Sequence, residues 1–92
     1  MKTIYKYSIP PDDHIEIELP VGAEILTVQT QHGEPQLWAL VDPDAPTETK
    51  QFRLAGTGHT IEDEAPYRFI GTFQLYNGNL VFHLFERLHQ YM

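Results

Sequence analysis

The fold is decided by the stretch Leu37-Trp38-Ala39-Leu40-Val41-Asp42-Pro43. It begins with the only run of five consecutive apolar residues in the chain, and it holds the only tryptophan. A strand with one face in water alternates apolar and polar residues, whereas this stretch does not. We therefore expect a strand that is covered on both faces, either by the rest of the domain or by another copy of the chain.

The residues around this stretch predict a single all-β domain over residues 1–92. Prolines and glycines recur at short intervals, and the segments between them are rich in β-branched and aromatic residues. No long segment has the periodicity of a helix. We expect about seven short antiparallel strands in a small sandwich or partly closed barrel. The expected strands cover residues 3–9, 14–19, 24–31, 36–41, 49–54, 67–76 and 79–85. Residues 86–92 are expected to fray or to form one helical turn.

Strict alternation assigns a face to each side chain in these strands. In residues 24–31, Leu26 and Val28 are expected on one face, with Ile25 on the polar side. In residues 67–76, the side chains expected to share a face are Tyr67, Phe69, Phe73 and Leu75. Gly71 interrupts that face and indicates a bulge or a close backbone approach.

The turns are predicted from their residue types. Residues 32–35 are expected to form a four-residue hairpin loop, and Asn77-Gly78 is the typical sequence of a type I′ turn. Residues 55–66 form the longest expected loop, and its acids at 62–64 are expected to be solvated.

Charge and composition limit the classes of partner. Acidic residues outnumber lysine and arginine by 13 to 6, which gives a formal net charge of -7. This balance argues against binding to nucleic acid or to anionic membranes. The chain has no cysteine and no stretch of about 20 apolar residues. Residues 1–7 lack the apolar core of a signal peptide, so we expect a cytosolic protein.

The sequence Gly56-Thr57-Gly58-His59 has two interpretations. Its glycines allow the backbone N–H groups to point at one anion, and Thr57 and His59 add polar side chains. Arg53 and Arg68 flank this segment and could contact a phosphate. The alternative is an ordinary glycine-rich turn between two strands.

Other residue types point less directly to chemistry. Trp38 could stack on a base, although such residues more often belong to a core. None of the five histidines has a recognised metal-ligand spacing, and a zinc site formed by three of them stays open as a minor alternative. His83 is expected to be a satisfied core or interface histidine. Ser8 has no nucleophile elbow around it, so we predict no catalytic residue and no cofactor.

Several motifs together resemble a family of small proteins encoded by tailed bacteriophages and prophages. They are Lys2-Thr3-Ile4-Tyr5-Lys6-Tyr7, Leu19-Pro20-Val21-Gly22-Ala23, the tryptophan stretch, Gly56-Thr57-Gly58-His59, Ile70-Gly71-Thr72-Phe73-Gln74 and Leu80-Val81-Phe82-His83-Leu84-Phe85. The resemblance implies a phage or prophage origin and a role in the cytoplasm of the infected bacterium. It implies no reaction.

Two functional hypotheses follow. The first is a non-enzymatic phage accessory protein that counters host defence as a homo-oligomer by sequestering a small anionic nucleotide. Its predicted ligand-binding residues are Trp38, Arg53, Gly56, Thr57, Gly58, His59 and Arg68. The alternative is a protein-binding module that inhibits a host protein or serves phage assembly. A homo-oligomer is expected because residues 36–41 and 79–85 both lack a polar face. A metal-dependent hydrolase is a third, minor hypothesis.

Overall fold

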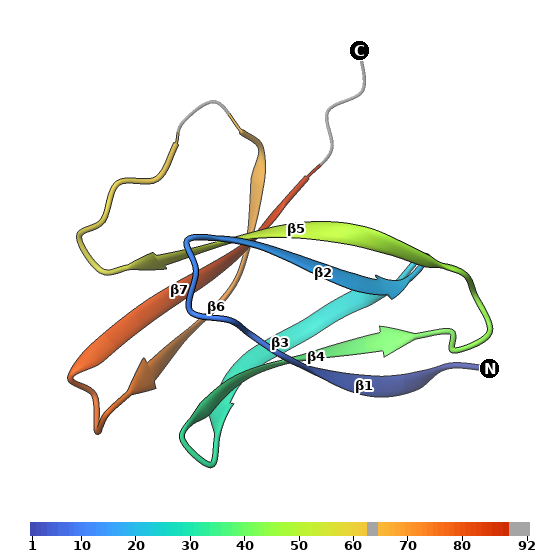
Figure 1. The fold of residues 1–92 in the computed structure, drawn as a ribbon, viewed down its shortest axis with the longest axis horizontal. Helices are drawn as coiled ribbons and strands as arrows, with labels where there is room; N and C mark the ends of the chain where they lie inside the picture. The colour runs from blue at the N-terminus through green and yellow to red at the C-terminus, as the bar shows by residue number, and fades with distance from the viewer. Residues whose placement is uncertain (63–64, 89–92) are drawn as a thin grey trace.

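The chain folds into two antiparallel sheets. The computed structural model describes residues 1–62 and 65–88. Its strands are β1 (Thr3–Ser8), β2 (His14–Pro20), β3 (Glu24–Gln31), β4 (Glu34–Val41), β5 (Thr47–Gly56), β6 (Tyr67–Leu75) and β7 (Leu80–Arg87). The three-stranded sheet has the order β1-β4-β3 and the four-stranded sheet the order β2-β5-β7-β6 (Figure 1). The predicted all-β class and all seven strands are confirmed.

The two sheets meet most closely where β3 approaches β6. The Thr30 hydroxyl donates a hydrogen bond to the Gln74 carbonyl oxygen across this junction, at 2.8 Å. Inside, the core is built from both sheets, and its fully buried large side chains are Leu19, Leu37, Val41, Phe52 and Leu84. The strands do not close into a barrel, so the fold is a small sandwich.

The strand β4 has one face in the core and one face outside it. Leu37, Ala39 and Val41 are fully buried, whereas Trp38 and Leu40 point outward and are half-buried. The molecule is only 16 Å thick along its shortest axis, which leaves room for two layers and no third. A single copy therefore covers one face of the tryptophan stretch and leaves the other in partial contact with water.

The expected faces of β3 are wrong because this strand contains a β-bulge. The register with β4 shifts between Ile25 and Thr27, so Leu26 is an extra residue without a partner. The insertion places Ile25 and Val28 on the core side, and Leu26 is 44% exposed. One extra residue inverts the alternation beyond it.

Gly71 marks a bulge and a close approach, as predicted. The register with β7 shifts between Phe69 and Gly71, and a Cβ atom on Gly71 would lie 2.9 Å from Cγ1 of Val28. The expectation that Phe69 and Phe73 share a face is wrong for the same reason as in β3. Phe73 is buried in the core, whereas Phe69 is 57% exposed on the outer face.

The turns differ slightly from their predicted limits. β3 and β4 are joined by the two residues His32 and Gly33, both with positive φ, rather than by a four-residue loop. Between β6 and β7, the turn closed by the hydrogen bond from Gly78 N to Leu75 O has Tyr76 and Asn77 at its centre, each with positive φ. The left-handed turn therefore begins one residue earlier than the Asn-Gly pattern predicts.

The chain end also differs from the expected tail. Glu86 and Arg87 belong to β7 rather than to a frayed end, because Phe52 and Gln51 of β5 pair with them. The rest of the expected tail from residue 89 onward, including His89, lies outside the described residues.

Candidate functional site

Arg53 is a buried cation on the outer side of the four-stranded sheet. It is only 5% exposed, although its neighbours Phe52 and Leu54 point to the opposite side, into the core. Its guanidinium donates to the carbonyl oxygens of Leu54 at 2.5 Å and of Thr60 at 2.8 Å. A longer bond of 3.4 Å reaches the carbonyl oxygen of Asp13. Arg53 therefore ties the start of β2 and the β5–β6 loop, residues 57–66, to the sheet.

Glu62 anchors the same loop from the other side. Its carboxylate accepts hydrogen bonds from Nε of Arg53 at 3.2 Å and from the Tyr67 hydroxyl at 2.9 Å. The imidazole of His14 lies 3.6 Å from the second carboxylate oxygen. Glu62 is exposed, as predicted, but its carboxylate is also held by contacts with three side chains. The other two predicted loop acids lie outside the described residues.

These contacts shift the ionisation of two groups. A hydrogen bond from the residue's own backbone, followed by the one from Tyr67, lowers the pKa of Glu62 to about 2. Partial burial, with the hydrogen bond to Glu62 next, raises the pKa of Tyr67 above its ordinary value of 10.0. Glu62 is therefore a carboxylate and Tyr67 a neutral donor at neutral pH.

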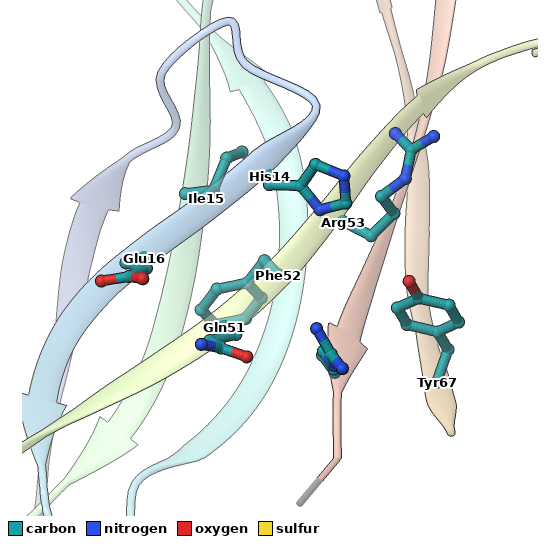
Figure 2. A pocket seen from close by; sticks show the side chains of 8 residues that line it. His14, Ile15, Glu16, Gln51, Phe52, Arg53 and Tyr67 are labelled. Carbon is teal, nitrogen blue, oxygen red and sulfur yellow. The ribbon is translucent and has the colours of Figure 1, made fainter. Parts of the chain in front are cut away.

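A groove crosses the outer face of the four-stranded sheet next to Arg53 and Glu62. It encloses about 310 Å³ and receives side chains from all four strands. Figure 2 shows His14 on β2 and Tyr67 on β6 on either side of Arg53. The complete lining is His14, Ile15, Glu16, Gln51, Phe52, Arg53, Tyr67 and Arg87. A second hollow of about 230 Å³ shares His14, Tyr67 and Arg87 and adds Glu62 and Ala65 of the loop.

An exposed aromatic row borders the groove. The ring centroids of Tyr67 and Phe85 lie 6.0 Å apart, and those of Phe69 and Phe85 lie 5.4 Å apart. These tilted pairs fix the rings relative to one another, while Phe69 keeps most of its surface in water. Arg87 sits opposite Tyr67 in the sheet register and forms no salt bridge with any described residue. The three rings therefore form a fixed apolar surface, and the guanidinium of Arg87 adds a positive charge beside it.

The predicted glycine turn is built differently from an anion nest. The N–H of Thr57 donates to Val81 O and that of His59 donates to Gly56 O, so two of its amides are already bonded. Of the two glycines, only Gly58 has a positive φ, of 89°. The imidazole of His59 lies over Gly56, where a Cβ atom would be 3.0 Å from its Cε1. The turn nevertheless borders a cavity of about 310 Å³, lined by Gly56, Thr57, His59, Asn79, Leu80, Val81 and Phe82.

The remaining predicted ligand residues lie elsewhere. Arg68 donates to Glu86 at 2.6 Å, and Lys50 contacts the other oxygen of the same carboxylate at 3.3 Å. Trp38 belongs to the outer face of the three-stranded sheet. The structure therefore keeps Gly56, Thr57, Gly58 and His59 together but does not bring them into one site with Arg68 and Trp38.

His83 is satisfied at both ring nitrogens, as predicted. The hydroxyl of Thr57 lies 2.8 Å from Nε2, and that of Thr72 lies 2.9 Å from Nδ1. A neutral imidazole donates at one nitrogen and accepts at the other, so one hydroxyl on each side completes its hydrogen bonds. The contact also holds the predicted glycine turn against β7.

One comparison with known proteins gives a match. The model of a domain of unknown function, DUF7352, matches residues 1–91. The chain belongs to this family. No match was found among curated proteins or among solved structures. Family membership therefore covers almost the whole domain and leaves the activity to be argued from the site itself.

Few features of the sequence point to the groove residues. His14, Glu62 and Tyr67 are far apart in the chain and match no motif, and Arg53 between Phe52 and Leu54 follows the ordinary alternation of a strand with one outer face. Within residues 1–62 and 65–88, no three histidine or acidic side chains are grouped in a way that could hold a metal ion. The same residues include no helix long and apolar enough to cross a membrane.

Proposed function

We propose that the chain is a non-enzymatic protein-binding module, and that the groove with its aromatic row is the recognition surface. The observation that carries the proposal is the exposure of Phe69 within a row that Phe85 and Tyr67 hold in place. Aromatic and arginine side chains dominate the binding energy of protein interfaces when they are rigid before binding. Phe69 is such a residue, and Arg87 is an exposed arginine on the same surface.

The charges around the groove favour a particular partner. Glu16 lines the groove, and the whole chain carries a net charge of -7. A partner segment with an apolar side chain for Phe69 and a basic group for Glu16 fits this pattern, since the nearby Glu62 is already bonded to Arg53 and Tyr67. The resemblance to proteins of tailed phages supports an accessory role in the host cytoplasm, where such a module inhibits a host protein or serves phage assembly.

The test is a matched pair of aromatic substitutions. Phe69→Ser removes the exposed ring of the row, and Tyr76→Ser removes a ring that is 72% exposed at the β6–β7 turn, outside the groove. The purified protein is used to capture partners from a bacterial extract. We expect wild type and Tyr76→Ser to retain the same protein, and Phe69→Ser to retain at least about tenfold less. Equal capture by both variants, or no specific capture by wild type, contradicts the proposal.

A second candidate is capture of a small nucleotide by the cavity at the glycine turn. It is favoured by the cavity itself, which gathers Gly56, Thr57 and His59 over the apolar side chains of Leu80 and Phe82. Stacking and hydrogen bonding would provide most of the affinity, because Arg53 and Arg68 are engaged with other groups. This surface suits a base better than a phosphate.

Calorimetric titration with cyclic nucleotides and ADP-ribose tests this candidate. Heat that disappears in His59→Ala and persists in His32→Ala, an exposed histidine of the β3–β4 turn, would support it. An absence of heat with every nucleotide would exclude it.

A further inference from the structure

The outer face of the three-stranded sheet has an apolar centre. In the strand register Ile4 lies beside Leu40, and Lys6 and Thr27 lie on either side of Trp38. The bulge turns Leu26 outward, and Ile4 is the most exposed of these apolar residues at 55%. Leu26, Ile4 and Trp38 line a shallow hollow of about 310 Å³ together with Thr27 and Gln29. The bulge therefore places Leu26 on this surface, where regular alternation would have placed Ile25.

Opposite charges flank this centre. Lys6 stands on the edge strand β1, and Glu24 stands on the other edge strand, β3, beside Leu40. Neither forms a salt bridge with any described residue, and Lys6 donates only to the neutral amide of Gln31, at 2.8 Å. The face thus has a lysine on one edge strand and a glutamate on the other, with apolar side chains between them, and the Lys6 ammonium reaches toward Gln31 of β3.

This pattern is complementary to itself. A two-fold axis that runs along the strands, in the plane between two stacked faces, places β1 of one copy over β3 of the other. It brings Lys6 toward Glu24 of the second copy, twice, and leaves Trp38 near the axis. Lys6 and Glu24 are offset by one row along the strands, about 7 Å, which the flexible lysine side chain can span when it exchanges the neutral Gln31 amide for the carboxylate. We propose that a second copy of the chain docks on this face and forms a two-fold symmetric dimer.

The size of the face sets the expected affinity. Three strands about 4.8 Å apart, each about 25 Å long, present roughly 400 Å² of flat area. A standard stable interface buries about 800 Å² per partner. The dimer is therefore expected to be reversible, with a dissociation constant of about 10–100 μM, and the monomer is expected to stay folded. This inference concerns a different face from the proposed protein-binding groove and does not depend on it.

A charge swap tests the dimer and its symmetry together. Sedimentation equilibrium is measured on wild type, Lys6→Glu, Glu24→Lys and the double variant. Each single change places like charges across the interface and is expected to weaken the dimer at least about tenfold. The double variant exchanges the two charges and is expected to recover to within about threefold of wild type.

Two controls separate the interface from general charge effects. Glu18→Lys makes the same charge change on the exposed side of β2, in the other sheet, and should leave the dimer unchanged. Leu26→Asp should abolish it while circular dichroism and thermal unfolding confirm a folded monomer. A wild-type protein that stays monomeric to about 1 mM would overturn the dimer. A double variant that fails to recover, or Glu18→Lys that weakens association as much as Glu24→Lys, would overturn the proposed two-fold arrangement.

Discussion

The two outer faces of the sandwich differ in which side chains they bury. On the four-stranded sheet, the charged Arg53 is withdrawn from water beneath the β5–β6 loop. On the three-stranded sheet, the apolar Trp38 is left half-buried, and the strands of that sheet are joined by connections of at most five residues. A long connection covers one face, and the other face has none. A face that the chain cannot cover itself is available to a second molecule.

The largest loss of stability is expected from a substitution in the core between the two sheets. Leu37→Ala removes a side chain with no exposed surface, and we expect it to lower the free energy of unfolding by about 2–5 kcal/mol. Leu40→Ala makes the same truncation on the outer side of the same strand and should cost less than about 1 kcal/mol. Urea unfolding at low protein concentration measures both. Equal losses would mean that the outer face of β4 is packed as tightly as the core.

A smaller effect is expected where the loop is tied to the four-stranded sheet. Arg53→Met keeps the volume but leaves the carbonyl oxygens of Leu54 and Thr60 without their donors, so we expect a loss of about 2–3 kcal/mol. The matched change Arg87→Met alters an exposed arginine of the same face and should stay within about 0.5 kcal/mol. If both substitutions were equally mild in urea unfolding, Arg53 would not hold the loop.

The junction between the sheets should show a coupled effect. Gly71→Ala places a methyl group against Val28, and we expect it to destabilise the fold by about 1–3 kcal/mol. In the background of Val28→Ala the same change should cost at least about 1 kcal/mol less, since the obstructing methyl groups are absent. A double-mutant cycle from thermal unfolding measures this coupling, and strict additivity would show that the two residues do not touch.

The smallest expected effect is the pH dependence of the loop anchor. Because the pKa of Glu62 in the folded protein, about 2, lies below its ordinary value of 4.5, its contribution to stability is complete above about pH 4.5. The contribution is lost as the pH falls toward 2. The stability difference between wild type and Glu62→Gln, measured by urea unfolding at a series of pH values, should therefore shrink over that interval. A difference that stays constant between about pH 4.5 and about pH 2 would show that the carboxylate is not held.

The strands could be predicted from the sequence because their signals are local. Turn residues mark the ends of each strand. The close approach at Gly71, which leaves no room for a side chain, is indicated by a glycine among apolar residues. The faces of β3 and β6 could not be predicted beyond their bulges. An extra residue such as Leu26 changes every later side chain, and nothing in the local sequence locates it.

The candidate site was harder to predict from the sequence than the strands, for a different reason. The partners of Arg53 outside its own strand lie 40 residues before it and 7 and 9 residues after it, in segments without regular structure. A flanking arginine is the same sequence signal whether it binds a phosphate or ties down a loop. The partners of Arg53 and of Arg68 could not be predicted, because folding brings them together from separate segments of the chain.

The difference between the two faces can be tested most directly by NMR spectra recorded over a concentration series. We expect the indole N–H of Trp38 and the amides of Ile4 and Leu26 to shift with a midpoint of about 10–100 μM. The amides of Tyr67 and Phe69, on the four-stranded sheet, should not shift. Spectra that are independent of concentration, or shifts at Phe69 in place of Trp38, would contradict the assignment of self-association to the three-stranded face.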